Sequence, residues 1–270
     1  MMVIVLVKQV PDPRSRAGLR EDGTIDRERV KAVMNPYDKC ALEAALRLKD
    51  GVGAKIAAVS MGPPRAEDVL REALAMGADE AVLLTDRRLA GSDTLATSYA
   101  LSEVIRKLGP YDLILCGMET TDGNTGQVGP EVAEHLGIPH LTYVESFEVK
   151  EGYVEAKRLI EGGYEILRVR MPALLTVTNT MYEPRDATFL GVIRALKEPI
   201  KVLSLEDVGI KEEVVGLRGS PTKIRKVERA SLRRAKCIIK GGSVEEMVEN
   251  LLRKLEENGV KLVMGRGEGG

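Results

Sequence analysis

The segment with the most features of a ligand site runs from Gly117 to Pro130 and reads GMETTDGNTGQVGP. Its small residues would let the backbone approach a ligand closely, and threonine hydroxyls with free amides at a helix start favour an anion. We expect a phosphate there, although an ordinary glycine-rich loop has the same composition. Asp122 would repel a phosphate at close range, so we expect it to shape the loop or to contact a ribose.

Two further polar segments precede predicted helices. Residues 35–38 read NPYD, in which Pro36 suits a first helical turn and Asn35 is either a simple cap or part of a wall around an adenosine. Residues 92–98 read SDTLATS, which can start a capped helix. That segment carries four hydroxyl groups, more than capping requires, so we expect ligand contacts there, with solvated hydroxyls as the alternative.

The sequence suggests no catalytic side chain and no metal site. Its three cysteines are scattered, and its two histidines, His135 and His140, are not at a metal-ligand spacing. There is no GxGxxG fingerprint and no SGGxDS-type loop, which argues against the usual dinucleotide-binding enzymes and against ATP-cleaving enzymes with a related sheet. Any redox chemistry must therefore be carried by a bound cofactor.

The elements that would position these segments alternate between strands and helices. Continuous apolar runs, typical of strands covered on both faces, are Met2–Val7, Lys55–Ser60, Glu80–Leu84 and Leu113–Cys116. Apolar stripes at helical spacing lie in Asp38–Lys49, Ala66–Met76, Asp93–Leu108 and Thr125–Leu136. This alternation predicts an α/β fold with a doubly wound, Rossmann-like parallel sheet, whose ligands bind at the carboxyl ends of the strands.

The pattern changes after His140. Strand-like runs separated by glycine turns predict hairpins and an antiparallel extension; these runs are Thr142–Val149, Tyr153–Leu159, Tyr164–Met171 and Ala173–Val177. A short helix is expected at Val192–Leu196, followed by a polar stretch and a helix over Val244–Glu257 that Ser243 can cap. We therefore expect a nucleotide-binding domain over residues 1–200 and a C-terminal arm over residues 201–270.

Composition excludes several classes of protein. The chain has 270 residues with 40 Lys+Arg against 41 Asp+Glu, so it lacks the basic excess of a nucleic-acid-binding protein. No apolar run reaches the ~18 residues of a membrane span. The first apolar stretch, Met1–Val7, lacks the basic start and small-residue cleavage site of a signal peptide, so we expect a cytoplasmic protein.

At these motifs the chain resembles the electron transfer flavoprotein β-subunit family. The similar stretches cover nearly the whole chain in order: VLVKQVPDP (5–13), MNPYDKCALEAALRLKD (34–50), AVSMGPP (58–64), REALAMGADEAVLL (71–84), DLILCGMETTDGNTGQVGPEVAEHLGIP (112–139) and EPRDATFLGVIRALK (183–197). The departure is Met118-Glu119, where many members have a basic or amide residue.

The resemblance implies a heterodimer with a larger α subunit that carries its own FAD. Ordinary members hold AMP in the β subunit as a structural ligand, whereas electron-bifurcating members hold a second FAD there, to which NADH delivers a hydride. SDTLATS (92–98) and DGNTGQVGPEVAEHLGIP (122–139) are similar to the bifurcating branch. The implied redox partners are ferredoxin and either a quinone reductase or an acyl-CoA dehydrogenase. A carrier that binds only AMP and a free-standing adenine-nucleotide sensor remain the alternatives.

The resemblance also implies cofactor-binding positions. On the adenine and AMP side these are Val7, Lys8, Asn35, Tyr37, Asp38, Met61 and Gly62; on the ribose and phosphate side they are Gly117, Thr121, Asp122, Gly123, Asn124, Thr125, Gly126, Gln127 and Val128; on the flavin ring side they are Asp93, Thr94 and Thr97. It implies too that Thr188–Lys197 docks a redox partner, unless those apolar residues are buried, and that the C-terminal helix contacts the α subunit, unless the arm folds back on its own domain.

Overall fold

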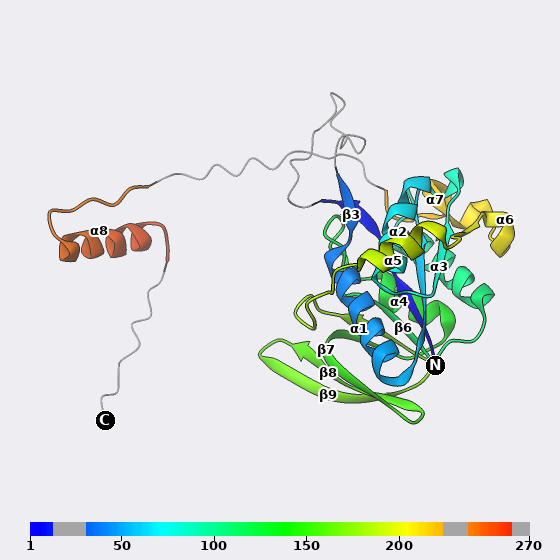
Figure 1. The fold of residues 1–270 in the computed structure, drawn as a ribbon. Helices are drawn as coiled ribbons and strands as arrows, with labels where there is room; N and C mark the ends of the chain where they lie inside the picture. The colour runs from blue at the N-terminus through cyan, green and yellow to red at the C-terminus, as the bar shows by residue number, and fades with distance from the viewer. Residues whose placement is uncertain (13–30, 224–236, 261–270) are drawn as a thin grey trace. The chain divides into compact units, whose positions relative to one another are not determined.

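A computed structural model of the chain describes residues 1–12, 31–223 and 237–260. The chain forms two compact units, residues 1–227 and residues 228–270. The first unit contains the sheet, and the described residues of the second include the helix α8 (Val244–Glu257) (Figure 1).

The sheet has nine strands in the order β11-β5-β4-β1-β6-β10-β7-β8-β9. Their bounds in chain order are β1 (Met2–Leu6), β4 (Lys55–Met61), β5 (Glu80–Leu84), β6 (Leu113–Gly117), β7 (His140–Lys150), β8 (Tyr153–Ile160), β9 (Gly163–Arg170), β10 (Ala173–Val177) and β11 (Lys201–Leu203). The strands from β11 to β7 pair in parallel, and β7, β8 and β9 pair antiparallel. A separate two-stranded sheet joins β2 (Gln9–Pro11) and β3 (Ala32–Met34).

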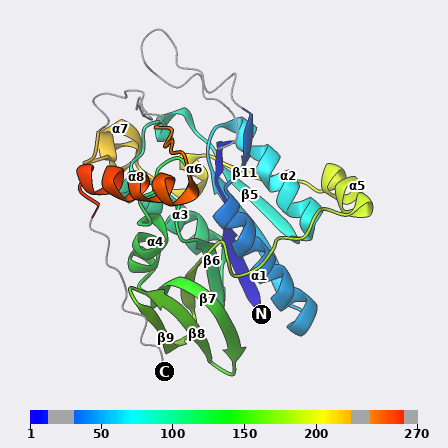
Figure 2. The ribbon, with the colours of Figure 1, turned by 90° about the vertical axis from the view of Figure 1, so that its left-hand side faces the viewer.

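Helices cover both faces of the sheet (Figure 2). Those of the first unit are α1 (Pro36–Val52), α2 (Glu67–Met76), α3 (Thr94–Leu108), α4 (Val128–Leu136), α5 (Phe189–Lys197), α6 (Leu205–Val208) and α7 (Gly216–Gly219). An apolar core lies on each face of the sheet. The central strand β1 contributes to both cores, because its alternate residues point to opposite faces. Val3 and Val5 join the core under α1 and α2, whereas Ile4 and Leu6 join the core under α3 and α4.

The predicted fold class is confirmed: a largely parallel α/β sheet carries an antiparallel extension. One strand differs from its prediction, because β10 is not part of the antiparallel extension. It lies between β6 and β7 and pairs in parallel with both. All five of its residues are buried, as a continuous apolar strand inside a parallel sheet should be. The antiparallel extension therefore consists of β8, β9 and the later part of β7.

The first unit continues past the expected boundary at residue 200. Strand β11 pairs with β5. After it, Leu205, Ile210 and Val215 are buried in the core beneath α3. A few apolar residues in an otherwise polar stretch are thus enough to fasten residues 201–220 to the main unit.

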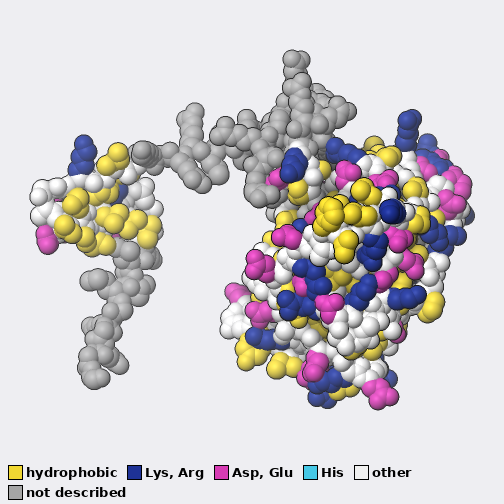
Figure 3. Space-filling view, in the orientation of Figure 1, with side chains coloured by type: hydrophobic (Ala, Val, Ile, Leu, Met, Phe, Trp, Pro, Cys, Tyr) yellow, Lys and Arg dark blue, Asp and Glu magenta, His cyan; other side chains and the backbone are white. Residues whose placement is uncertain are grey.

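Helix α8 has the bounds that the sequence predicted, and Ser243 caps it by accepting a hydrogen bond from the backbone N–H of Glu246. None of its residues, all of which the structure describes, is buried. Its apolar side chains gather along the helix in Figure 3 and include exposed Val248, Leu251 and Leu252. Within the described residues, no helix is both long enough and apolar enough to cross a membrane.

Candidate functional site

The order of the strands places a candidate site at the carboxyl ends of β1 and β6. From β1 the chain moves outward through β4 and β5 and then returns to β6 on the other side of β1. Ligands of doubly wound sheets bind at such a switch point. Lys8 follows β1, Gly62 follows β4 and Met118 follows β6, so predicted binding residues from three strand ends meet at one edge of the sheet.

Asp38 joins the two strand ends to α1. Its carboxylate accepts hydrogen bonds from the backbone N–H groups of Lys8 and Gly117, both at 2.9 Å. The backbone at Gly117 lies so close to the start of α1 that a Cβ on Gly117 would be 2.5 Å from Cβ of Tyr37. Burial raises the pKa of Asp38 to about 7, although the two N–H groups act in the opposite direction. Asp38 therefore serves as a buried support for the site.

Asn35 does not cap α1 with its side chain in the described structure. Its amide nitrogen instead donates to the carbonyl of Glu119 at 2.9 Å, and its amide oxygen accepts from the N–H of Thr121 at 3.3 Å. Asn35 is completely buried. The interpretation as a simple cap is therefore wrong, since this side chain holds the loop that follows β6.

Lys8 and Asp122 form an ion pair across the site, with the ammonium 2.8 and 2.9 Å from the two carboxylate oxygens. Burial acts to raise the pKa of Asp122, but the pKa is lowered overall because Lys8 stabilises the carboxylate. Asn124 and Gly126 adopt left-handed backbone conformations, with φ of 48° and 64°. Backbone turns of this kind can direct successive N–H groups toward an anion. Asp122 thus joins this loop to the end of β1, and its charge is paired with that of Lys8.

The loop residues expected to start the fourth helix remain outside it. Helix α4 begins at Val128 rather than at Thr125, so Thr125, Gly126 and Gln127 belong to the loop. The reason is the left-handed backbone of Gly126, which a right-handed helix cannot include. The free amides of the helix start therefore lie closer to Gly129 than the sequence suggested.

The hydroxyl-rich segment SDTLATS lies against this loop. Asp93 caps α3 by accepting from the N–H of Ala96 at 3.0 Å. The hydroxyl of Thr94 lies 3.1 Å from a carboxylate oxygen of Glu131 and 3.3 Å from the side-chain oxygen of Gln127. Thr97 is half-buried three residues further along α3. The starts of α3 and α4, distant in sequence, thus meet at the site.

Two polar atoms in this region are suited to a ligand. Thr121 Oγ1 and Glu131 Oε2 are buried and have no hydrogen-bond partner in the described part of the chain. Buried polar groups normally have a partner, and ribose hydroxyls or a ring N–H would supply one. Glu131 had no signal in the sequence beyond its place in the first turn of a predicted helix. The residues present therefore fit an adenine nucleotide that extends toward α3.

The predicted site residues differ in how they could take part. Val7, Asn35 and Asp38 are buried, so their side chains support the site from below. The other predicted residues lie on five segments and are partly or fully exposed: Lys8, Tyr37, Met61, Gly62, Asp93, Thr94, Thr97, Gly117, Thr121, Asp122, Gly123, Asn124, Thr125, Gly126, Gln127 and Val128.

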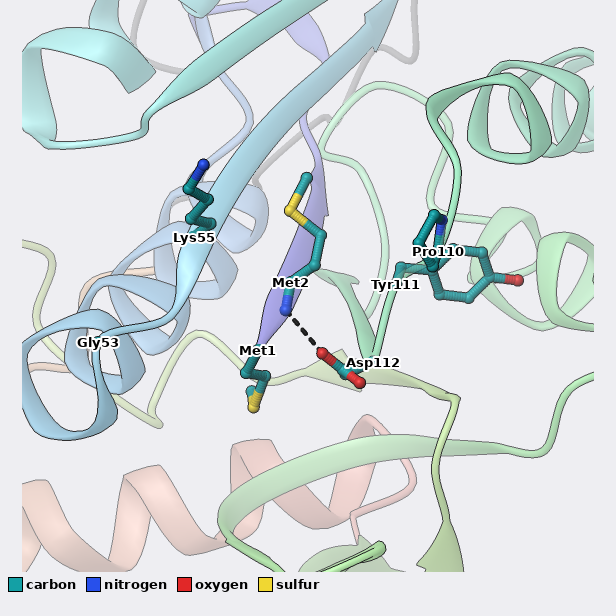
Figure 4. A pocket seen from close by; sticks show the side chains of 7 residues that line it. All are labelled: Met1, Met2, Gly53, Lys55, Pro110, Tyr111 and Asp112. Atoms are coloured by element: carbon teal, nitrogen blue, oxygen red, sulfur yellow. Dashed lines mark hydrogen bonds between the residues drawn. The ribbon is translucent and has the colours of Figure 1, made fainter.

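A hollow at the opposite edge of the sheet has different chemistry. It is lined by Met1, Met2, Gly53, Lys55, Pro110, Tyr111 and Asp112 (Figure 4). These residues lie at the amino ends of β1 and β4 and just before β6. The one carboxylate, on Asp112, accepts a hydrogen bond from the backbone N–H of Met2 at 2.7 Å. This hollow lies away from the switch point and is not part of the candidate site.

Comparison with known proteins matches residues 22–208 to the family described as "Electron transfer flavoprotein domain". The chain is 44% identical over 261 residues to the electron transfer flavoprotein subunit beta of Thermoanaerobacterium thermosaccharolyticum, covering 96% of this chain and 100% of the relative. The chain belongs to the electron transfer flavoprotein beta subunit family.

Two other relatives of this electron transfer flavoprotein subunit carry more specific names. The Caffeyl-CoA reductase-Etf complex subunit CarD of Acetobacterium woodii is 40% identical over 258 residues, covering 95% of this chain and 98% of the relative. The Acryloyl-CoA reductase electron transfer subunit gamma of Anaerotignum propionicum is 40% identical over 264 residues, covering 94% and 99%. Both names describe subunits that work with a CoA reductase.

In this electron transfer flavoprotein subunit, α5 displays its apolar residues outward. Phe189, Leu190 and Leu196 are 80%, 75% and 74% exposed, and only Ala195 is buried. Hydrophobic side chains gather over this helix in Figure 3. The alternative in which these residues are buried on the sheet is therefore wrong, and a surface of this kind is typical of a protein contact.

Polar contacts hold α5 in place instead. Arg194 donates from α5 to the carbonyls of Leu74 and Ala78 near the end of α2, at 2.8 and 2.9 Å. In the reverse direction, Arg71 donates from α2 to the carbonyl of Ala195 at 2.6 Å. Each arginine thus satisfies carbonyls at the end of the other helix. The apolar surface of α5 is therefore displayed on a firmly attached helix.

Proposed function

We propose that the chain is the β subunit of a heterodimeric electron transfer flavoprotein of the bifurcating type. It binds FAD at the carboxyl ends of β1 and β6, beside an α subunit that holds its own FAD. The bound FAD supplies the redox chemistry, in which a hydride arrives from NADH and its two electrons leave separately, one for ferredoxin and one for the α-subunit FAD.

The observation that carries this proposal is the contact of Thr94 with Gln127 and Glu131. An AMP needs only the loop after β6 and the strand ends beneath it. The start of α3 adds hydroxyls directly beside that loop, which gives the site a second half toward which a longer dinucleotide can extend. The unpartnered Glu131 Oε2 lies at this junction and supports the longer ligand.

Different segments of the site bind different parts of the FAD. The loop from Gly117 to Gln127 offers backbone amides and hydroxyls to the phosphates and ribose, while Lys8 balances the charge of Asp122. Thr94 and Thr97 face the flavin ring, where hydroxyls and the positive end of α3 favour electron density on the ring. The FAD carries the chemistry, and none of the described side chains is assigned the role of nucleophile or general base.

The partners follow from the same proposal. Helix α8 contacts the α subunit, and exposed α5 docks the redox partner that receives electrons from the α-subunit FAD. Two relatives are named for CoA reductases, which supports an acyl-CoA dehydrogenase-type acceptor, with a quinone reductase as the alternative. The complex is cytoplasmic.

Counting cofactors in the purified complex with the α subunit tests the proposal. We expect two FAD per heterodimer and bleaching of flavin absorbance by NADH. One FAD plus one AMP would favour the non-bifurcating carrier, for which Lys8 and the loop alone suffice. No flavin at all would favour a nucleotide sensor without redox function.

A further inference from the structure

Residues 216–222 are fastened to the start of α3, more than 120 positions earlier in the chain. The hydroxyl of Ser220 accepts a hydrogen bond from the backbone N–H of Asp93 at 2.8 Å and donates to the carbonyl of Gly216 at 2.6 Å. The N–H of Gly216 donates to the hydroxyl of Ser92 at 2.9 Å. Ser220 is 3% exposed, so these bonds are shielded from water.

The carboxylate of Asp93 belongs to the same network. One of its oxygens caps α3 at Ala96, and the other accepts from the backbone N–H of Thr222 at 2.9 Å. Asp93 is one of the predicted cofactor-binding positions, and each of its carboxylate oxygens accepts a hydrogen bond from within the chain. Asp93 therefore connects the first turn of α3, through Ala96, to the backbone at Thr222.

The packing around this contact leaves little freedom. Gly216 has a left-handed φ of 61°, and a Cβ there would lie 2.0 Å from the carbonyl oxygen of Arg88. On its other side the start of α3 presents Thr94 to Gln127 and Glu131. The first turn of α3 is therefore enclosed between the candidate cofactor loop and residues 216–222.

We propose that Ser220 is a positioning residue that sets the start of α3 so that Thr94 meets the flavin side of the site. This inference rests on the proposed binding of FAD. A hydrogen bond loses most of its strength when donor and acceptor move apart by several tenths of an ångström, so a shift of α3 removes the contribution of Thr94. Ser220 thereby links cofactor retention to residues 216–222.

The test measures the dissociation constants of FAD and AMP for the β subunit within its complex with the α subunit. Ser220→Ala should raise the FAD constant about tenfold, the effect of one lost buried hydrogen bond, and should alter the visible spectrum of the bound flavin. The AMP constant should change less than about twofold, because Asn35 still holds the loop after β6 through its own two hydrogen bonds. Ser204→Ala, which removes the cap of α6 in the same unit, is the control and should change neither constant.

A second pair of variants keeps the test decisive if Ser220→Ala fails to fold. Thr222→Pro removes the N–H that Asp93 accepts, whereas Thr222→Ala keeps it, so only the proline variant should lose FAD. Unchanged FAD binding in both Ser220→Ala and Thr222→Pro overturns the inference. Equal loss of FAD and AMP also overturns it, since the role is then merely structural. If the natural chain itself holds no FAD, the proposed function fails and the inference fails with it.

Discussion

The ammonium of Lys8, at the end of β1, lies 2.8 Å from a carboxylate oxygen of Asp122, in the loop after β6. Their side chains are 46% and 29% exposed. An ion pair this exposed adds little to folding stability. We expect the ion pair to matter for ligand binding instead, because Lys8 neutralises a carboxylate in the loop where a phosphate is expected.

Lys8→Ala should therefore weaken binding of AMP and FAD about tenfold, because it leaves the Asp122 carboxylate free to repel the phosphates. The double variant Lys8→Ala with Asp122→Asn should recover part of that loss. Calorimetric titration with AMP measures the loss of affinity in the single variant and its recovery in the double variant. A double variant that binds more weakly than Lys8→Ala alone would show that the lysine contacts the phosphate directly.

The double change Thr94→Val and Thr97→Val should weaken FAD retention by about one to two orders of magnitude, since each hydrogen bond is worth ~0.5–1.5 kcal/mol. Both side chains lie on one face of α3 because they are three residues apart. AMP should still bind. Loss of both ligands would mean that this helix start is structural, and loss of neither would favour the AMP-binding carrier.

Asp38 predicts a pH dependence of stability. Its pKa is about 7 in the folded chain and 3.8 ordinarily, so the folded state keeps a proton that the unfolded chain releases. Stability from this group is complete below pH 3.8 and is lost as pH rises to about 7. The stability difference between the natural chain and Asp38→Asn should therefore shrink over this range, by up to about 4 kcal/mol. Urea unfolding at several pH values measures it, and a constant difference would contradict the raised pKa.

Helix α8 should be needed for pairing with the α subunit. Removing residues 243–270 should weaken association while leaving the first unit folded, because the exposed apolar residues of α8 are lost. Leu251→Gln should reproduce part of that effect, and Arg253→Gln, on the polar side of the helix, should not. Sedimentation of the mixed subunits gives the affinities. A truncated chain that pairs as tightly as the full chain would refute the role of the arm.

Leu190→Ala should slow electron transfer to the redox partner without altering cofactor content. The side chain is 75% exposed on α5, so its truncation should affect docking rather than folding. Val52→Ala, at a residue 65% exposed on α1, provides the control. The apparent KM for the partner should rise several-fold in the first variant only. An unchanged KM would show that the partner docks elsewhere.

The sequence predicted much of the fold because its signals are local. The apolar runs gave β5 and β10 with their observed bounds, and Ser243 marked the start of α8. Buried strands and capped helices depend on residues that are neighbours in the chain, so their patterns are visible without the structure. The segment Gly117–Pro130 stood out as a predicted ligand segment for the same reason, because its glycines and hydroxyl residues are neighbours in the chain.

Pairing and packing were decided by contacts between distant residues. The run Ala173–Val177 has the composition of a strand, but only the tertiary structure placed it in parallel between β6 and β7. Residues 201–220 read as a polar arm, yet three buried apolar side chains and one short strand attach them to the first unit.

The site shows the same division. Sequence alone determined that hydroxyls, glycines and a helix start follow the predicted strands, because those are properties of residue type and spacing. The tertiary structure decided that Asn35 holds a loop instead of capping a helix, and that Thr94 meets Glu131. Each of these depends on a hydrogen bond between segments far apart in the chain, and a hydrogen bond requires a geometry that only the folded backbone supplies.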